Sequence, residues 1–253
     1  MEGVAVGSLH RVDSPVLEDV NWTVKAGEYW VLAGFQGSGK TDFLMTAGGV
    51  MAPLRGRYEL LRESMPIFDD ARLSHRLRLG LVFDGGQLFN HLTVRQNIAL
   101  PLRYHHNLSA EQAKPQVDAW LEEMELGDAG DRTPGALGRN WQQRAGLARA
   151  LILQPEVLLV DNPLSGLDLR HETWWLKFLD RLVEGHPLVG NRPVTLICTT
   201  SDLRPWRGPA CLFAVVRHHR LNLIGAWERL DQQQRDLVLD LLPSSGVDAA
   251  GTI

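Results

Sequence analysis

The chain of 253 residues contains few cysteines and no long apolar run. Its two cysteines, Cys198 and Cys211, are too few and too far apart in sequence for a disulfide framework or a zinc site. Each lies in a short apolar segment, so we expect both thiols to be buried. The longest apolar runs, such as 157–160 and 212–216, are far shorter than the roughly 20 residues of a membrane-spanning helix. With no signal-peptide pattern at the N-terminus either, we expect a cytoplasmic chain.

The chain also lacks an excess of charge of either sign. Lysine and arginine together number 26 against 30 aspartates and glutamates, which gives a formal net charge of −4. This balance is unlike that of a nucleic-acid-binding domain, so we expect no nucleic-acid partner. The hydrophobic share of 44% and the charged share of 22% are ordinary for a globular protein. They exclude collagen-like, disordered and disulfide-scaffold classes.

Short apolar segments that are typical of buried strands alternate with amphipathic, helix-like segments. The strand-like segments include 29–34, 157–160, 194–199 and 212–216, whereas the stretch 92–154 is mostly helical in pattern. Strands that are apolar on both faces favour a mostly parallel sheet covered by helices. The sequence therefore predicts an α/β fold in which the helical stretch forms an inserted subdomain.

Residues 34–41, GFQGSGKT, match the pattern G-x-x-x-x-G-K-[ST] without exception. The motif follows a predicted strand and opens a predicted helix, as its chemistry requires. The glycines let successive backbone N–H groups point at a β-phosphate, assisted by the helix N-terminus. Lys40 is expected to reach the β- and γ-phosphates, and the Thr41 hydroxyl to bind Mg²⁺. The predicted nucleotide-binding residues are Gly34, Phe35, Gln36, Gly37, Ser38, Gly39, Lys40, Thr41 and Asp42.

An acidic residue suited to hold Mg²⁺ follows far downstream. The segment VLLVD at 157–161 is an apolar strand that ends in Asp161, and SGLD at 165–168 follows after a proline. Many buried strands end in aspartate, so each feature alone is weak. In this order after Lys40, and behind a helical insert, the two together are specific. The sequence thus predicts a magnesium site at Thr41 and Asp161.

These blocks together resemble the nucleotide-binding subunit of ABC transporters over about 10–235. The resemblance rests on LEDVNWTVKAGEYWVLAGFQGSGKT, LFNHLTVRQNIALPL, LGRNWQQRAGLARALILQPEVLLVDNPLSGLD and VTLICTTSDL. Within it, DGGQLFNHLTVRQNIALPLRYHHNLS is most similar to the ATPase of the Mla-type bacterial lipid transporters. The resemblance implies a RecA-like P-loop NTPase core with a mostly parallel sheet, an N-terminal antiparallel β part and an inserted α-helical subdomain.

The resemblance also implies a domain organisation, ligands and partners. It implies one ATP-binding domain over 1–242, with a flexible tail at 243–253. The ligands would be ATP and Mg²⁺. The partners would be an integral-membrane permease and a second ATP-binding subunit, in a homo- or heterodimer on the cytoplasmic face of the inner membrane. Leu88–Leu102 corresponds to the family's groove for the permease, although an ordinary amphipathic helix is the alternative interpretation. The core would comprise about 1–90 and 155–242, and the helical subdomain about 91–154.

Three positions depart from the family's catalytic pattern. Asn162 stands where the family has the glutamate that polarises the attacking water. An amide cannot accept a proton, so a general-base contribution of about 10²–10⁴ in rate should be missing. Ser201 replaces the family's switch histidine, and Asp84 replaces the glutamine after the strand at 79–83. Asp84 would either bind Mg²⁺ or repel the phosphates.

The signature L-S-G-G-Q departs as well, because residues 137–141 are LGRNW. In the family this helix N-terminus caps the γ-phosphate of the opposite subunit. Arg139 and Asn140 replace the two glycines that permit that approach, so steric closure is in question. Arg139 would alternatively pair with phosphate charge. The aromatic residue that stacks on the adenine would fall near His10 or Arg11.

Three functions follow from these features. The first is an ATP-binding transporter subunit in which ATP closes or stabilises the dimer by binding energy, with hydrolysis weakened or lost. The second is an active ATPase that powers transport with a non-standard catalytic set, in which Asp84 or another residue takes the role of the base. The third is a P-loop kinase, which the SGLD block at 165–168 and the helix after Trp141 argue against.

Overall fold

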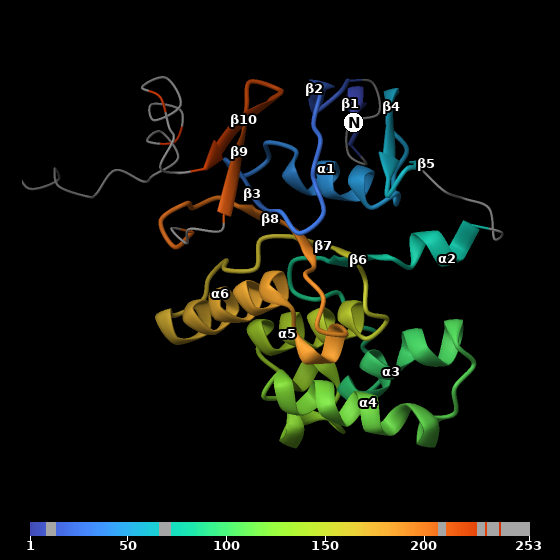
Figure 1. Cartoon of the computed structure of the whole chain (residues 1–253). Helices are drawn as coiled ribbons and strands as arrows, with labels where there is room; N and C mark the ends of the chain where they lie inside the picture. Colours follow the sequence, from blue (N-terminus) through green and yellow to red (C-terminus); the bar gives the residue numbers. More distant parts are fainter. Residues whose placement is uncertain (9–13, 66–71, 207–210, 227–230, 232–237, 239–253) are drawn as a thin grey trace, which may run out of the picture.

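The computed structural model of the chain describes residues 1–8, 14–65, 72–206, 211–226, 231 and 238. The expectations placed on His10, Arg11 and the tail at 243–253 lie outside these residues. Two sheets and a group of helices make up the described part (Figure 1).

A six-stranded sheet forms the centre of the molecule, with its strands in the order β10-β9-β3-β8-β7-β6. The five strands from β9 to β6 run parallel, and β10 is antiparallel to β9. All residues of β3, β7 and β8 are buried, because these strands are covered on both faces. The strands span Tyr29–Gly34 (β3), Leu79–Val82 (β6), Val157–Val160 (β7), Thr195–Thr200 (β8), Cys211–Arg217 (β9) and Arg220–Ala226 (β10).

A smaller antiparallel sheet stands beside one face of the central sheet, in the order β2-β1-β4-β5. Figure 1 shows it next to helix α1, whose Phe43 packs with Trp22 and Trp30 into one hydrophobic core. The strands span Glu2–Val6 (β1), Leu17–Val20 (β2), Arg55–Leu60 (β4) and Glu63–Met65 (β5).

The larger hydrophobic core lies on the opposite face of the central sheet, beneath the main group of helices. Strand β3 shows the division, because Tyr29 and Val31 enter this core while Trp30 and Leu32 enter the other. Thr93 and Ser109 begin α3 and α4 with complete capping boxes. The α-helices span Lys40–Ala47 (α1), Leu73–Arg76 (α2), Val94–His105 (α3), Ala110–Glu123 (α4), Arg139–Leu151 (α5) and Leu169–Glu184 (α6), and short 3-10 helices span Gly127–Ala129 (η2), Pro134–Ala136 (η3) and Pro187–Val189 (η4).

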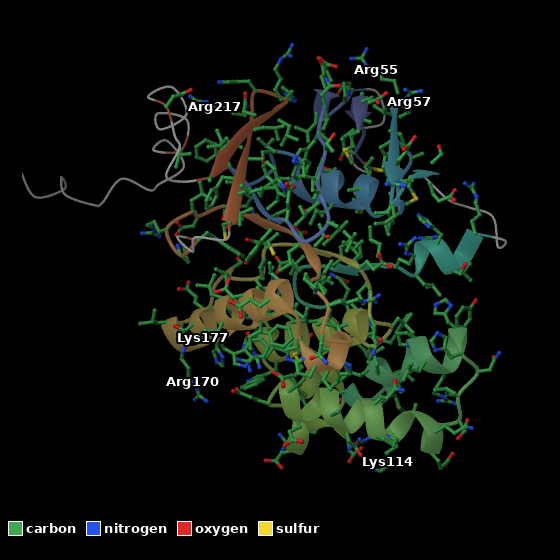
Figure 2. All side chains as sticks on the ribbon, in the orientation of Figure 1. Arg55, Arg57, Lys114, Arg170, Lys177 and Arg217 are labelled. Atoms are coloured by element: carbon green, nitrogen blue, oxygen red, sulfur yellow. The ribbon has the colours of Figure 1, made fainter. Side chains whose placement is uncertain are left out.

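This architecture confirms the predicted α/β class with a mostly parallel sheet and a separate antiparallel β part. Both cysteines are buried, as expected from their apolar surroundings. Strands β1, β5 and β10 had not been predicted. Among the described residues, no helix is both long and apolar enough to cross a membrane. Figure 2 shows labelled basic side chains at widely separated places, including Arg57 on β4, Lys114 on α4 and Arg170 on α6.

Candidate nucleotide site

The loop between β3 and α1 carries the G-x-x-x-x-G-K-T motif, and each of its three glycines meets a structural requirement. Gly37 and Gly39 have φ values of +77° and +94°, in the left-handed region that favours glycine. A Cβ atom at Gly34 would lie 2.6 Å from the Ser38 hydroxyl and 3.1 Å from the Val216 carbonyl oxygen. The loop therefore turns tightly from the buried strand into the helix, which places the N-terminus of α1 directly after β3.

Lys40, the first residue of α1, folds back over this loop. Its ammonium Nζ donates hydrogen bonds to the carbonyl oxygens of Gly34 at 2.7 Å and Phe35 at 2.9 Å. The side chain is buried, and desolvation lowers the pKa of Lys40 to about 8, against a smaller opposing effect of Asp161. A buried ammonium that donates hydrogen bonds to neutral carbonyl oxygens is a favourable partner for phosphate.

Thr41 and Asp161, the two residues predicted to hold Mg²⁺, lie in direct contact. The Thr41 hydroxyl donates to Asp161 Oδ2 at 2.8 Å, and the Thr199 hydroxyl donates to Asp161 Oδ1 at 2.6 Å. Asp161 is 5% exposed, and its backbone N–H donates to the Val82 carbonyl at the end of β6. The contact from Thr199 was not predicted from the sequence.

This donor set fits Mg²⁺ bound together with a nucleotide. A hydroxyl and a carboxylate supply oxygen ligands, and Mg²⁺ commonly takes its remaining ligands from water and phosphate. Within the described residues, no group of three or more His, Cys, Asp or Glu side chains forms a metal site made by protein alone. Thr41 and Asp161 would thus hold the ion only in company with the phosphates.

The positions that directly follow Asp161 and the end of β8 carry neither a carboxylate nor an imidazole. Asn162 follows Asp161 with φ +51°, a left-handed conformation that asparagine tolerates better than most residues, and its N–H donates to the Thr199 hydroxyl. Ser201 is exposed just after the end of β8. Neither side chain can accept a proton from water in the way that a glutamate does.

Asp84 and Arg139 form an ion pair within the same chain. Asp84 follows β6 by two residues, and Arg139 is the first residue of α5. The sequence predicts that Asp84 either binds Mg²⁺ or repels the phosphates, and that Arg139 alternatively pairs with phosphate charge. The structure pairs the two residues with each other, although they lie far apart in sequence.

Asn140 is directed into its own chain, with its side chain buried. Its amide Nδ2 lies 2.9 Å from His171 Nδ1, and its Oδ1 accepts a hydrogen bond of 3.0 Å from the indole of Trp175. Both partners belong to α6. Only Arg139 of the two glycine-replacing residues therefore presents an exposed side chain.

Arg144, one helical turn beyond Asn140, is stacked between two aromatic rings. Its guanidinium carbon lies 4.6 Å from the ring centroid of Trp141 and 3.6 Å from that of Trp174. The side chain is 1% exposed and donates to the Glu125 carboxylate at 2.8 Å. Desolvation lowers the pKa of Arg144, and Glu125 opposes this. This cluster anchors α5 to α6 and was not predicted from the sequence.

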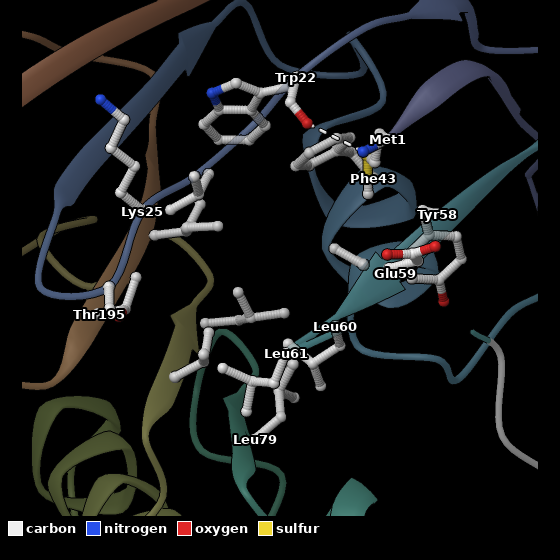
Figure 3. Close-up of a pocket in the computed structure, with 16 residues that line it drawn as sticks. Met1, Trp22, Lys25, Phe43, Tyr58, Glu59, Leu60, Leu61, Leu79 and Thr195 are labelled. Atoms are coloured by element: carbon white, nitrogen blue, oxygen red, sulfur yellow. Dashed lines mark hydrogen bonds between the residues drawn. The ribbon is translucent and has the colours of Figure 1, made fainter. Parts of the chain in front are cut away.

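A cavity of about 130 Å³ lies away from the P-loop. Figure 3 shows Phe43 of α1 and Leu79 of β6 among its walls, with Lys25 and Glu59 nearby. No residue of the motif at 34–41 lines it, and its walls are mostly apolar. It is therefore unsuited to a triphosphate.

Comparison with known proteins identifies similar chains and folds. The family model described as "ABC transporter" matches residues 17–165. The Fe(3+) ions import ATP-binding protein FbpC of Fusobacterium nucleatum is 35% identical over 158 residues, which are 62% of this chain and 41% of that protein. The probable ribonucleotide transport ATP-binding protein mkl of Mycobacterium tuberculosis is 36% identical over 158 residues, which are 61% of this chain and 44% of that protein. The chain thus spans less than half the length of these two relatives.

A solved structure of similar fold is the dimeric, post-hydrolysis state of the ATP-binding cassette MJ0796 bound to ADP and Pi. It superposes with a TM-score of 0.75 at 26% identity, covering 87% of this chain and 94% of that chain.

Proposed function

Because the chain belongs to the ABC transporter family, we propose that it is an ATP-binding subunit of a membrane transporter in which ATP hydrolysis is weakened or lost. One observation carries the proposal. The cluster of Lys40, Thr41 and Asp161 is complete, whereas Asn162 and Ser201 supply no base and no imidazole beside it. The expected domain of 1–242, with a core at about 1–90 and 155–242 and a helical subdomain at about 91–154, is part of this proposal.

Binding of ATP is supported by the geometry of the P-loop. In the proposed complex, backbone N–H groups of 34–42 and the Lys40 ammonium hold the phosphates, while Thr41 and Asp161 hold Mg²⁺. The tight turn, the buried ammonium and the paired oxygen ligands all suit this role.

Weak hydrolysis is supported by the chemistry of the neighbouring positions. The amide of Asn162 orients a water but accepts no proton, which removes about 10²–10⁴ in rate. Asp84 is the alternative base that the sequence offers, and its carboxylate is engaged by Arg139. In the proposed role, ATP acts through binding energy, stabilising the state that holds it.

The proposed partners are an integral-membrane permease and a second ATP-binding subunit, on the cytoplasmic face of the inner membrane. Two exposed apolar side chains support the second subunit: Phe35 in the P-loop is 56% exposed, and Leu169 at the start of α6 is 77% exposed. Phe89 and Tyr104, 50% and 73% exposed in and beside Leu88–Leu102, support docking to a permease.

We further propose a lipid as the transported substrate. This rests on the similarity of residues 84–109 to the Mla-type ATPase. The relatives named above carry different substrate names, iron for FbpC and ribonucleotide for mkl, which is expected where the substrate contacts lie in other subunits.

The test is the identity of the nucleotide that the purified chain retains after incubation with MgATP. Lys40→Ala serves as the blank, and Lys177→Ala, an exposed lysine on α6, is the matched control. Intact ATP in stoichiometric amount, lost only in Lys40→Ala, is the expected result. Recovery of ADP would contradict the loss of hydrolysis and favour the active ATPase, in which case Asp84→Asn should abolish turnover. No nucleotide from the unmodified chain would contradict ATP binding.

A further inference from the structure

We propose that Arg139 compensates the charge of Asp84 and thereby permits a nucleoside triphosphate to bind beside that carboxylate. The inference deepens the proposed function and rests on ATP binding at the P-loop. It assigns to the altered signature residue a role within its own chain.

The sheet places Asp84 at the edge where the phosphates are expected. Val82, the last residue of β6, pairs with Val160, the last residue of β7. The N–H of Asp161 donates to the Val82 carbonyl, and the Asp161 side chain contacts Thr41. The loop that carries Asp84 therefore starts beside the proposed magnesium ligands.

The guanidinium of Arg139 lies over the same loop. It pairs with the Asp84 carboxylate, and its Nη1 would be 3.5 Å from a Cβ atom built at Gly85. The next basic residue of α5, Arg144, is turned away into the cluster with Trp141 and Trp174. Among the described residues, no other basic side chain forms an ion pair with Asp84.

Helix α5 does not depend on this ion pair for its position. A Cβ atom at Gly146 would lie 2.7 Å from Gly86 Cα, and one at Gly86 would lie 2.2 Å from the Gln142 carbonyl oxygen. Arg149 also donates to the Gly86 carbonyl at 2.8 Å. Because backbone packing already fixes the helix against the loop, the contribution left to Arg139 is mainly electrostatic.

The charges at this edge of the sheet indicate that the electrostatic contribution of Arg139 is to offset the negative charge of Asp84. The hydroxyls of Thr41 and Thr199 satisfy Asp161, and Lys40 is the cation of the P-loop itself. Without Arg139, Asp84 would add an uncompensated negative charge beside a highly anionic ligand. The repulsion should be larger for ATP than for ADP, because the γ-phosphate adds charge. The two side chains are 58% and 32% exposed, so salt should reduce the effect.

The experiment is a double-mutant cycle of Asp84→Asn and Arg139→Gln, with dissociation constants for MgATP and MgADP measured on the full chain at low and high salt. Arg57→Gln, which removes the exposed ion pair with Glu2 on the small sheet, is the matched control. We expect Arg139→Gln to weaken MgATP binding about three- to tenfold at low salt, with a smaller effect on MgADP and at high salt. Asp84→Asn and the double variant should bind MgATP at least as tightly as the unmodified chain, and Arg57→Gln should change nothing.

Two results would overturn the inference. Unchanged MgATP affinity in Arg139→Gln would show that Asp84 is not a repelling charge. Equal weakening in Arg139→Gln and in the double variant would show that Arg139 meets phosphate itself or positions α5. Failure of the proposed function would give a different result, since the unmodified chain and all variants would then bind no ATP.

Discussion

The hydroxyl of Thr41 lies 2.8 Å from the carboxylate of Asp161, and this hydrogen bond joins two residues that are 120 positions apart in the sequence. The contact exists because β3 leads into the P-loop and β7 ends at Val160, directly before Asp161, at the same edge of the mostly parallel central sheet, with β8 between the two strands. The carboxyl ends of parallel strands are the usual place for ligands in such sheets. Both side chains supply oxygen, so the edge suits a hard cation.

Asp161→Asn should make ATP binding insensitive to Mg²⁺. The amide keeps the size of the side chain and removes the negative charge that attracts the ion. We expect ATP affinity with Mg²⁺ to fall about tenfold, and affinity with excess chelator not to fall. Titration of both nucleotide complexes measures this, with Asp128→Asn, an exposed aspartate in η2, as control. A Mg²⁺ dependence that survives in Asp161→Asn would exclude this residue as a ligand.

Lys40 should give the folded chain a specific dependence on pH. The pKa of Lys40 is about 8 in the folded chain, against 10.5 as its ordinary value. Between these two values the unfolded chain binds a proton that the folded chain has released, so this residue makes the folded state more stable as pH rises. The free energy of unfolding of the unmodified chain, relative to Lys40→Met, should therefore increase by about 2–4 kcal/mol from pH 7.5 to pH 10.5.

Urea unfolding at several pH values measures this difference, with Lys177→Met as control. Tyr29 and Cys198 change stability in the opposite direction over part of this range, because burial raises the pKa of each. Their contribution is common to both chains and cancels in the comparison. A difference that is flat with pH would contradict the lowered pKa of Lys40.

The elements that sequence patterns predicted well are those with strong local signals. The P-loop is contiguous, so its residues and its place between a strand and a helix followed from the motif alone. The strand ending in Asp161 was equally clear from its apolar run. Strand β1 was missed because EGVAV is short, and its pairing with β2 and β4 is a tertiary effect.

The contacts around α5 could not be predicted, since they depend on side chains that meet only in the folded chain. The sequence showed that Asp84 and Arg139 depart from the family, but their pairing requires the position of α5 against the loop after β6. In the same way, Asn140 was expected to obstruct an outside partner, whereas its hydrogen bond to Trp175 directs it inward. The residue types indicated which hydrogen bonds and ion pairs each side chain can form, and the packing of α5 determined which of them do form.

Arg144→Gln should destabilise the chain by about 2–4 kcal/mol. The substitution removes a buried guanidinium that lies over the rings of Trp141 and Trp174. It also removes the charged partner of the Glu125 carboxylate. Arg181→Gln is the control, because Arg181 lies 5.2 Å from the Phe178 ring but is 48% exposed. The control should cost less than about 1 kcal/mol. Equal midpoints of urea unfolding for the two variants would contradict a special role of the buried stack.

Asn162→Glu with Ser201→His should raise the rate of ATP hydrolysis, because it places a proton acceptor and an imidazole at the end of β7 and β8. With the signature residues unchanged, we expect a gain of at least about tenfold in phosphate release under single-turnover conditions. The gain should come with a loss of about 1 kcal/mol in stability, because Asn162 has φ +51° and glutamate tolerates that conformation less well. Asn191→Glu tests the predicted loss of stability alone, since Asn191 is exposed, has φ +54° and lies in a loop that contributes nothing to the nucleotide site. This control variant should lose a similar amount of stability and gain no ATPase activity. If the double variant loses stability but hydrolyses ATP no faster, the missing base does not limit the rate of hydrolysis. The altered signature at 137–141 would then be the next feature to restore.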